Sequence, residues 1–324
     1  MDLKKRKLNV RAVLDIRELS ILGAAVILFF ALSVASPYFL TLDNLLLVAR
    51  QISILAIIAT GMTFLLIAKE IDLSVGSNYG FLAIVLAFII TRTTINPWIA
   101  LIIVIIFGAF IGFINGIFTT MFRMPSFIVT LGMLSVLRGG ALLLSGAWPI
   151  NIRLPAEHSF LNITSGHVGG VVPTQIFWMI AIIIIASFVL LKTRFGAHVY
   201  STGGNEEAAK LSGIPIKRVK IITFMITGAL CGIGAGLLLG QVMSAFPLGG
   251  AGFELNVIAA VVIGGTQLFG GRGTIVGTLI GAAIMGMITN GLVLMGVSAH
   301  VEPLAKGGII ILAVLIHILT RKKI

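Results

Sequence analysis

Five polar side chains stand out because they interrupt long apolar runs: Asn78, Tyr79, Asn115, Asn256 and Asn290. In hydrocarbon such groups cost free energy unless they find hydrogen-bond partners or face a water-filled cavity. The chemistry open to them is therefore hydrogen bonding. One interpretation is that they hold neighbouring helices together. The other is that they line a polar passage and offer weak, transient hydrogen bonds to hydroxyl groups.

Residues that could carry covalent or metal chemistry are scattered along the chain. The five histidines show no metal-ligand spacing, and a single cysteine, Cys231, allows neither an intrachain disulfide nor a cysteine-based metal site. No G-x-x-x-x-G-K-S/T loop occurs, so the chain is not expected to hold a nucleotide in that way. We therefore predict that this chain is not an enzyme and binds no metal or cofactor of its own.

The elements that position these polar groups are apolar helices. Of the 324 residues, 58% are hydrophobic and 10% are charged, whereas a soluble domain carries about 25% charged residues. A helix needs about 20 apolar residues to cross the hydrocarbon. The sequence thus predicts an all-α polytopic membrane protein with about ten transmembrane helices. We place them at about 19–40, 44–68, 72–92, 97–122, 126–145, 174–192, 219–242, 254–269, 274–297 and 304–320.

The distribution of Lys and Arg predicts the orientation, because short cytoplasmic loops are enriched in these residues. With the N-terminus inside, most of the 23 basic residues fall on the inner side, and an even number of spans puts the C-terminus there too. Segments 1–18 and 321–324 are then cytoplasmic and flank one transmembrane domain, 19–320. The net charge of +12 comes from the loops, so we expect membrane lipid and no nucleic acid as a partner.

The second half of the chain echoes the first. "DLSV" at 72–75 recurs as "ELNV" at 254–257, "INGIF" at 114–118 recurs as "TNGLV" at 289–293, and Pro125 corresponds to Pro303. The two halves, about 19–145 and 174–320, each hold five predicted spans. Because five is odd, the halves lie in opposite orientations. Inverted five-helix repeats are a transporter architecture, with the transport route near the repeat interface.

A polar segment, 193–218, separates the sixth and seventh spans and faces the cytoplasm in this topology. Within it, Asn205 is a good helix N-cap, acidic residues occupy the first turn, and Gly213 ends the helix. A helix of two turns is unstable alone and must pack on something. The hypothesis is a docking helix for a cytoplasmic partner, and the alternative is a solvated connector. The predicted docking residues are Gly204, Asn205, Glu206, Glu207, Ala208, Ala209, Leu211, Ser212 and Gly213.

Three stretches carry a family resemblance. "GGNEEAAKLSGI" resembles the coupling-helix loop of ATP-binding-cassette importer permeases. "EIDLSVGS" at 70–77 and "NVIAAVVIGGTQLFGGRGTIVGTLIGA" at 256–282 resemble the branch that includes ribose, xylose, galactose and autoinducer-2 permeases. The motif residues are Asp72, Ser74, Gly76, Gly264, Gly265, Gly270, Gly271 and Gly273. One departure is Lys69-Glu70, which stands where the family usually has a glycine pair.

The resemblance implies a type II importer-like permease subunit in the bacterial inner membrane. A separate cytoplasmic ATPase would bind ATP and Mg, and a soluble binding protein would deliver the solute outside. A second permease chain, identical or related, would share one central route. The solute would be a monosaccharide or a similar small polyhydroxy compound, ribose-like in the first instance, moved by alternating access.

Two other classes compete with this interpretation. An ion- or proton-coupled secondary transporter can also have inverted repeats, but it commonly carries intramembrane carboxylates or histidines. By the span boundaries above, Asp72 and Glu254 open spans and do not lie at mid-membrane. An intramembrane enzyme has no supporting motif.

The topology makes a direct prediction. A cysteine introduced near Gly204 should react with a membrane-impermeant thiol reagent only from the cytoplasmic side. One introduced near Gly166, in the longest outer loop, should react only from outside. Reversed labelling at either site would contradict the ten-span topology.

Overall fold

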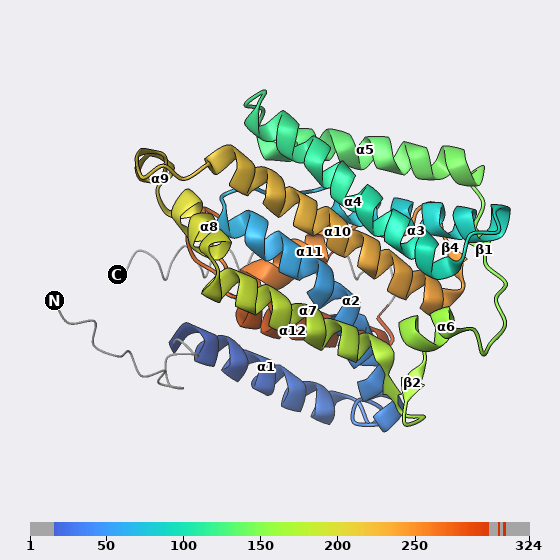
Figure 1. The fold of residues 1–324 in the computed structure, drawn as a ribbon. Helices are drawn as coiled ribbons and strands as arrows, with labels where there is room; N and C mark the ends of the chain where they lie inside the picture. Colours follow the sequence, from blue (N-terminus) through green and yellow to red (C-terminus); the bar gives the residue numbers. More distant parts are fainter. Residues whose placement is uncertain (1–15, 298–303, 305–306, 309–324) are drawn as a thin grey trace.

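The computed structural model describes residues 16–297, 304, 307 and 308. In this part of the chain the fold is a bundle of helices (Figure 1). The helices are α1 (Ile16–Ala35), α2 (Leu42–Ile67), α3 (Val75–Arg92), α4 (Pro97–Thr120), α5 (Ser126–Ser145), α6 (Ser159–Thr164), α7 (Thr174–Lys192), α8 (Arg194–Gly204), α9 (Glu206–Leu211), α10 (Ile216–Val242), α11 (Phe253–Ile263) and α12 (Ile275–Leu294). Two short antiparallel strand pairs complete it: β1 (Ile150–Asn151) with β4 (Ser244–Ala245), and β2 (His167–Val168) with β3 (Val172–Pro173).

Seven of the described helices are long and apolar enough to cross a membrane: α2, α3, α4, α5, α7, α10 and α12. They correspond to the predicted second to seventh and ninth spans. Local signals set several ends. Asn96 caps α4 by accepting a hydrogen bond from the Trp98 N–H, Pro97 occupies its first turn, and Gly146 ends α5 with a left-handed backbone. The chain is therefore a polytopic helical membrane protein.

The other three predicted spans differ from expectation in extent. The apolar part of α1, Leu19–Ala35, is shorter than the predicted span 19–40. Helix α11 has 11 residues, so it rises only about 16 Å and cannot cross the hydrocarbon alone; the prediction of a span over 254–269 is wrong at its C-terminal end. The predicted span 304–320, with Pro303 and the segments 1–15 and 321–324, lies outside the described residues. The total of ten spans stays a prediction.

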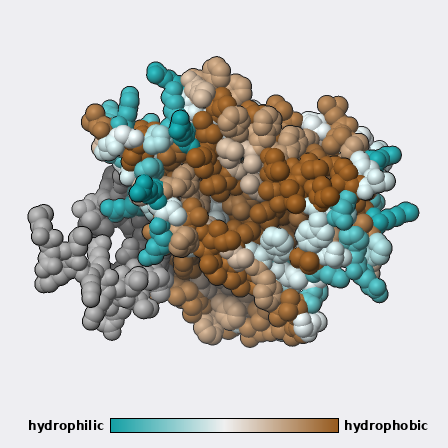
Figure 2. Space-filling model, in the orientation of Figure 1, coloured by the Kyte–Doolittle hydropathy of each residue, from teal (hydrophilic) through white to brown (hydrophobic). Residues whose placement is uncertain are grey.

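The buried centre of the bundle consists of α2, α3, α10 and α12, whereas α5 and α7 are mostly exposed. Exposed apolar side chains cover the outer helices, for example Leu143 on α5 and Ile184 on α7. Figure 2 shows the result as a broad apolar belt between two polar ends. This surface fits a surrounding of lipid tails.

Close helix packing crosses between the two predicted repeats. The second helix of each packs on the fourth of the other: α10 on α4, and α2 on α12. Along α4 and α10 a Cβ atom at Gly108 or at Gly228 would collide with the carbonyl oxygen of the other glycine. Small residues permit such approach where no hydrophobic effect drives helices together. This exchange is the packing expected of inverted repeats, which themselves stay a prediction.

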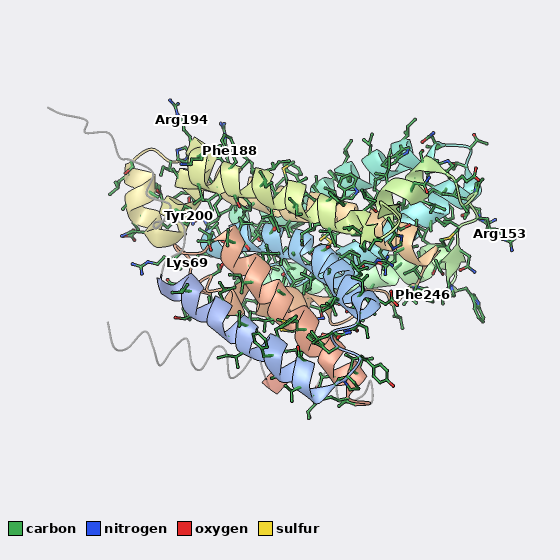
Figure 3. All side chains as sticks on the ribbon, turned by 90° about the horizontal axis from the view of Figure 1, so that it is seen from below. Lys69, Arg153, Phe188, Arg194, Tyr200 and Phe246 are labelled. Carbon is green, nitrogen blue, oxygen red and sulfur yellow. The ribbon has the colours of Figure 1, made fainter. Side chains whose placement is uncertain are left out.

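The two polar ends of the bundle hold different segments. Lys69, Arg194 and Tyr200 lie at one end, and Arg153 and Phe246 lie at the other (Figure 3). The first end, called here the α8–α9 end, contains all of segment 193–218. The opposite end contains the β1–β4 strand pair, which joins Asn151 to Ser244. In the predicted topology the α8–α9 end is cytoplasmic.

Candidate functional site

Helix α3 begins inside the bundle rather than at its surface. After α2 ends, residues 68–74 turn back between the helices. Their backbone is satisfied by side chains of α5: the Ile71 N–H donates to Ser126 Oγ at 3.3 Å, and the Leu73 N–H donates to Thr130 Oγ1 at 3.0 Å. Non-helical backbone at membrane depth needs such partners within the protein. The Val75 carbonyl then accepts from the thiol of Cys231, which lies in the middle of α10.

Helix α11 begins beside the start of α3. A Cβ atom at Gly76 would collide with the Glu254 carboxylate and with the Gly250 carbonyl oxygen, so these segments lie in direct contact. The rings of Tyr79 and Phe253 stack with centroids 5.1 Å apart. The two repeat-related motifs, "DLSV" and "ELNV", therefore meet inside the bundle. Interrupted helices that meet in this way form the binding sites of many transporters.

The position of Glu254 corrects one expectation from the sequence. We expected it to open a span at the membrane surface. Instead its carboxylate lies against Gly76, one residue after the carbonyl that contacts Cys231 in mid-helix. The predicted start of the span agrees with the start of α11 at Phe253, and the expectation failed because α11 begins inside the bundle rather than at the membrane surface.

Several polar atoms near this junction are buried and have no hydrogen-bond partner in the described part of the chain. They are Ser77 Oγ, Asn78 Oδ1, Asn115 Oδ1, Glu254 Oε2 and Asn256 Oδ1. A buried polar atom without a partner costs about 1–3 kcal/mol. Three of the five are amide oxygens, which can only accept hydrogen bonds. A fourth is a carboxylate oxygen, which likewise only accepts when the group is ionised. The junction therefore has unused capacity for ligands that donate hydrogen bonds, such as water or hydroxyl groups.

A cavity lies between α2, α11 and α12 and adjoins this junction. Its volume is about 240 Å³, and Gln51, Phe253, Asn256 and Thr289 are among its lining residues. Gln51 and Thr289 were not predicted as pathway residues. Each lies next to another polar residue, Arg50 or Asn290, in or beside an apolar run, and only the fold brings the two together.

The other predicted pathway residues occupy different settings. Asn115 is fully buried on α4 and donates to Ser74 Oγ at 3.1 Å and to Asp72 Oδ2 at 3.5 Å. Asn290 on α12 exchanges two hydrogen bonds with Asn44 on α2, of 2.7 and 3.2 Å. Both contacts fit the helix-holding interpretation. Asn78 and Tyr79 are buried in the first turn of α3.

The predicted docking helix is present as α9, and its ends are as expected. Asn205 Oδ1 accepts from the Ala208 N–H at 3.0 Å, Glu206 and Glu207 occupy the first turn, and Gly213 has a left-handed backbone with φ of 77°. Gly204 ends the preceding helix, and Ser212 caps the C-terminus of α9.

The face that α9 offers to a partner differs from expectation. Ala209 is 4% exposed and packs against its own chain, so the expectation that it contacts a partner is wrong. Leu211 is 90% exposed. The side chain most available for docking is therefore the leucine.

Helix α8 precedes α9 and was not predicted from the sequence. Tyr200 donates to the Gly273 carbonyl at 2.7 Å, and Gly203 lies too close to the Ile67 carbonyl for any Cβ atom. The same carbonyl accepts from the Gly271 N–H at 2.9 Å. Helix α8 thus joins the end of α2 to the loop 264–274.

The motif glycines in that loop have backbone roles. Gly265, Gly270 and Gly271 have positive φ values of 87°, 83° and 81°, which glycine adopts at little cost. Gly264 lies against Gly277, and Gly273 lies against Thr266, too close for a side chain. Asp72 is buried and accepts from the Ser74 N–H at 2.8 Å at the start of α3.

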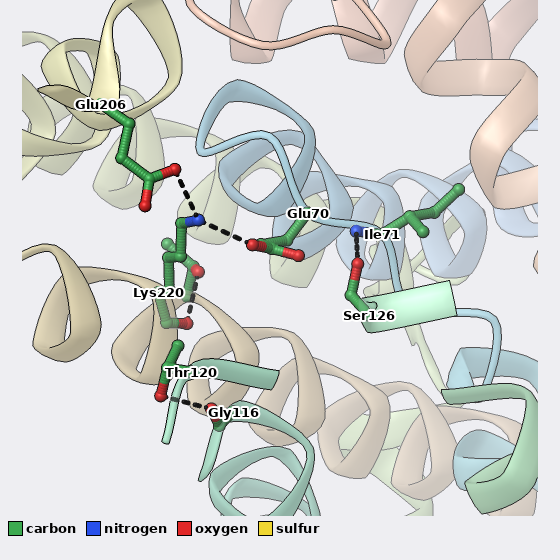
Figure 4. Close-up of polar contacts among 8 residues, drawn as sticks. Glu70, Ile71, Gly116, Thr120, Ser126, Glu206 and Lys220 are labelled. Carbon is green, nitrogen blue, oxygen red and sulfur yellow. Dashed lines mark hydrogen bonds and ion pairs between the residues drawn. The ribbon is translucent and has the colours of Figure 1, made fainter. Parts of the chain in front are cut away.

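The departure at Lys69-Glu70 coincides with a buried ion cluster. Lys69 takes the left-handed φ of 69° that would suit a glycine. Glu70 Oε1 lies 2.8 Å from Lys220 Nζ, which also lies 3.1 Å from Glu206 Oε2 (Figure 4). Lys220 is 9% exposed. One ammonium group therefore joins α9, α10 and the segment that leads into α3.

These features define a class of protein: a multi-pass membrane permease with interrupted helices and a short, capped helix, α9, at one end. The family described as "Branched-chain amino acid transport system / permease component" matches residues 44–319, and the chain belongs to this family.

Several named relatives cover most of the chain. It is 39% identical over 295 residues to the ribose import permease protein RbsC of Escherichia coli (strain K12), covering 90% of this chain and 91% of RbsC. It is 35% identical to the L-arabinose ABC transporter permease protein AraH of Azospirillum brasilense, covering 89% and 84%. It is 33% identical to the autoinducer 2 import system permease protein LsrC of Photorhabdus luminescens, covering 93% and 89%.

The Asn44–Asn290 pair yields a prediction. If the pair holds α2 on α12, Asn290→Leu should destabilise the protein by about 1–3 kcal/mol, because it leaves Asn44 Oδ1 buried without a donor, while the Asn44 amide keeps its hydrogen bond to the Phe39 carbonyl. Adding Asn44→Leu should cost only the further loss of its hydrogen bond to the Phe39 carbonyl, since both side-chain amides of the pair are then gone. Thermal unfolding in detergent of the two single variants and the double variant measures this coupling. Stable single variants with slowed transport would instead indicate a passage role.

Proposed function

We propose that this chain is the membrane subunit of an ATP-driven, binding-protein-dependent importer for a monosaccharide or a similar small polyhydroxy solute. The observation that carries the proposal is the cluster of unpaired acceptor oxygens where α3 and α11 meet. A polyhydroxy solute supplies hydroxyl donors to such oxygens. The names of the relatives, which include ribose, L-arabinose and autoinducer 2 permeases, support the solute class, with ribose first.

The proposed route passes the cavity between α2, α11 and α12 and the junction beside it. Gln51, Asn256 and Thr289 would offer single hydrogen bonds to a passing solute. Weak contacts suit passage, because a deep site would trap the solute. Asn78 and Glu254 lie at the junction and become available when α3 and α11 move apart. Asn115, through its hydrogen bonds to Ser74 and Asp72, and Tyr79, through its stacking on Phe253, would control that movement.

The proposed coupling runs through the buried ion cluster. A cytoplasmic ATPase, which holds ATP and Mg, docks on α9 through the exposed Leu211 and neighbouring residues. Displacement of α9 carries Glu206, which is ion-paired to Lys220, and Lys220 is ion-paired to Glu70. Glu70 lies two residues before Asp72 and so acts on the start of α3. A soluble binding protein docks at the opposite end, and a second permease chain completes the route.

One observation favours the alternative of an ion- or proton-coupled transporter. Glu254 is a carboxylate inside the bundle with an unpaired oxygen, which is the type of group that such transporters use. Membership of a permease-component family argues for the importer. The two functions differ in their energy source, so one assay separates them.

That assay uses proteoliposomes that contain this chain, its ATPase and its solute-binding protein. Labelled ribose is the first substrate. Uptake should require ATP and Mg on the ATPase side and should be unchanged when ionophores collapse the proton and sodium gradients. Uptake that persists without ATP and stops with the ionophores would establish the secondary transporter.

The docking role of α9 makes a separate prediction. Leu211→Asp places a charge on the exposed tip of α9 and should lower stimulation of ATP hydrolysis by the loaded binding protein at least tenfold. Ser201→Asp adds the same charge to an exposed position on α8 and is the matched control. Assembly in the membrane should be normal in both, since both sites face solvent. Normal stimulation of ATP hydrolysis in the Leu211→Asp variant would show that α9 takes no part in coupling.

A further inference from the structure

A second and larger cavity opens at the α8–α9 end, away from the proposed route. Its volume is about 590 Å³, and it lies between the end of α4, helix α9 and the start of α10. The side chains relevant to its chemistry are Thr119, Arg123, Glu206, Lys210, Lys217 and Arg218. Two of these residues, Glu206 and Lys210, lie on α9, but the proposed function assigns no ligand to the cavity.

The cavity is strongly basic. Arg123, Lys210, Lys217 and Arg218 are exposed, and none of them forms an ion pair within the described residues. Lys220 at its edge is already paired with Glu70 and Glu206. Four unpaired cations around one opening create a positive potential that attracts anions.

Two further features point to an anion. Helix α10 begins at this cavity without a side-chain cap and without an acidic residue in its first turn. Its Ile216 N–H donates to the Ile214 carbonyl, and the next two N–H groups and the helix dipole are available to an anion. Thr119 lines the cavity, is 8% exposed, and its hydroxyl has no hydrogen-bond partner in the described part of the chain. A hydroxyl donor, helix N–H groups and flexible cations together suit a phosphate group.

The surroundings of the cavity are apolar on one side. Met121, Phe122 and Phe127, at the turn between α4 and α5 beside Arg123, are all more than half exposed. Exposed aromatic and apolar residues next to cations are typical of the membrane–water interface. Basic pockets between transmembrane helices at this level bind anionic lipid headgroups.

We propose that this cavity binds the phosphate group of an anionic phospholipid from the cytoplasmic leaflet. Arg123, Lys217 and Arg218 hold the phosphate together with the first turn of α10 and Thr119, and the acyl chains lie along Met121 and Phe122. The lipid is a structural ligand beside α9 and is independent of the transported solute.

The experiment uses the purified full-length chain in neutral detergent and native mass spectrometry. Phosphatidylglycerol and phosphatidylcholine of identical acyl chains are titrated separately. The wild type should bind one phosphatidylglycerol more tightly than phosphatidylcholine. Lys217→Gln with Arg218→Gln should weaken that binding about 30-fold, at about 1 kcal/mol for each cation. Lys192→Gln with Arg194→Gln removes two exposed cations from the same end but outside the cavity, and should leave affinity within about threefold of wild type.

A third variant, close in shape to the wild type, tests the site even if the double variant misfolds. Thr119→Val removes only the hydroxyl and should weaken phosphatidylglycerol binding about tenfold. Equal affinity for the two lipids, or equal loss in both double variants, would overturn the site. Complete displacement of the lipid by excess inorganic phosphate would identify free phosphate as the ligand, and displacement by the ATPase subunit would make the cavity part of a protein interface. Either result overturns the lipid assignment.

Discussion

A buried ammonium ion cannot remain without counter-charges, and Lys220 is such an ion. It is 9% exposed and lies within hydrogen-bond distance of Glu70 and Glu206, which belong to segments on either side of it. The Glu70 side chain is 10% exposed, and removing it from this buried pair should cost about 3–5 kcal/mol. The Glu206 side chain is 49% exposed, so its ion pair with Lys220 contributes less. Separating α9, α10 and the segment before α3 would break these ion pairs, so the three elements are expected to move together. These ion pairs connect α9 with the segment that leads into α3, and so relate the proposed docking helix to the interior of the bundle.

The second constraint is that backbone groups at membrane depth need partners within the protein. Hydroxyl groups of Ser126 and Thr130 satisfy residues 71 and 73, which lets α3 begin inside the bundle. Glycines at 76 and 250 let α11 begin against it. The consequence is a junction at or near which several buried acceptor oxygens have no hydrogen-bond donor in the described part of the chain. A solute rich in hydroxyl groups can satisfy them briefly, and this is the physical basis of the proposed route.

Local patterns predicted local structure well, and distant contacts could not be predicted. The Asn205 cap and the Gly213 end of α9 follow from adjacent residues, and seven spans follow from apolar length. The Asn44–Asn290 pair joins residues 246 positions apart, so no sequence window contains it. Whether the Ala209 side chain faces the protein or the solvent depends on how α9 packs, and the sequence of a two-turn helix does not determine that packing. The start of α11 was predicted to within one residue, but its position inside the bundle was not, because hydropathy does not show at what depth a helix begins.

The most direct test of this account is the charge of Lys220 in the assembled importer. Lys220→Met should lower the stimulation of ATP hydrolysis by the loaded binding protein at least tenfold, while Lys192→Met, an exposed lysine at the same end of the bundle, should not. Reversing all three charges, with Glu70→Lys, Lys220→Glu and Glu206→Lys, should restore most of the stimulation because the attractions are re-formed. Normal stimulation in an assembled Lys220→Met complex, or no recovery in a stably assembled triple reversal, would contradict the account.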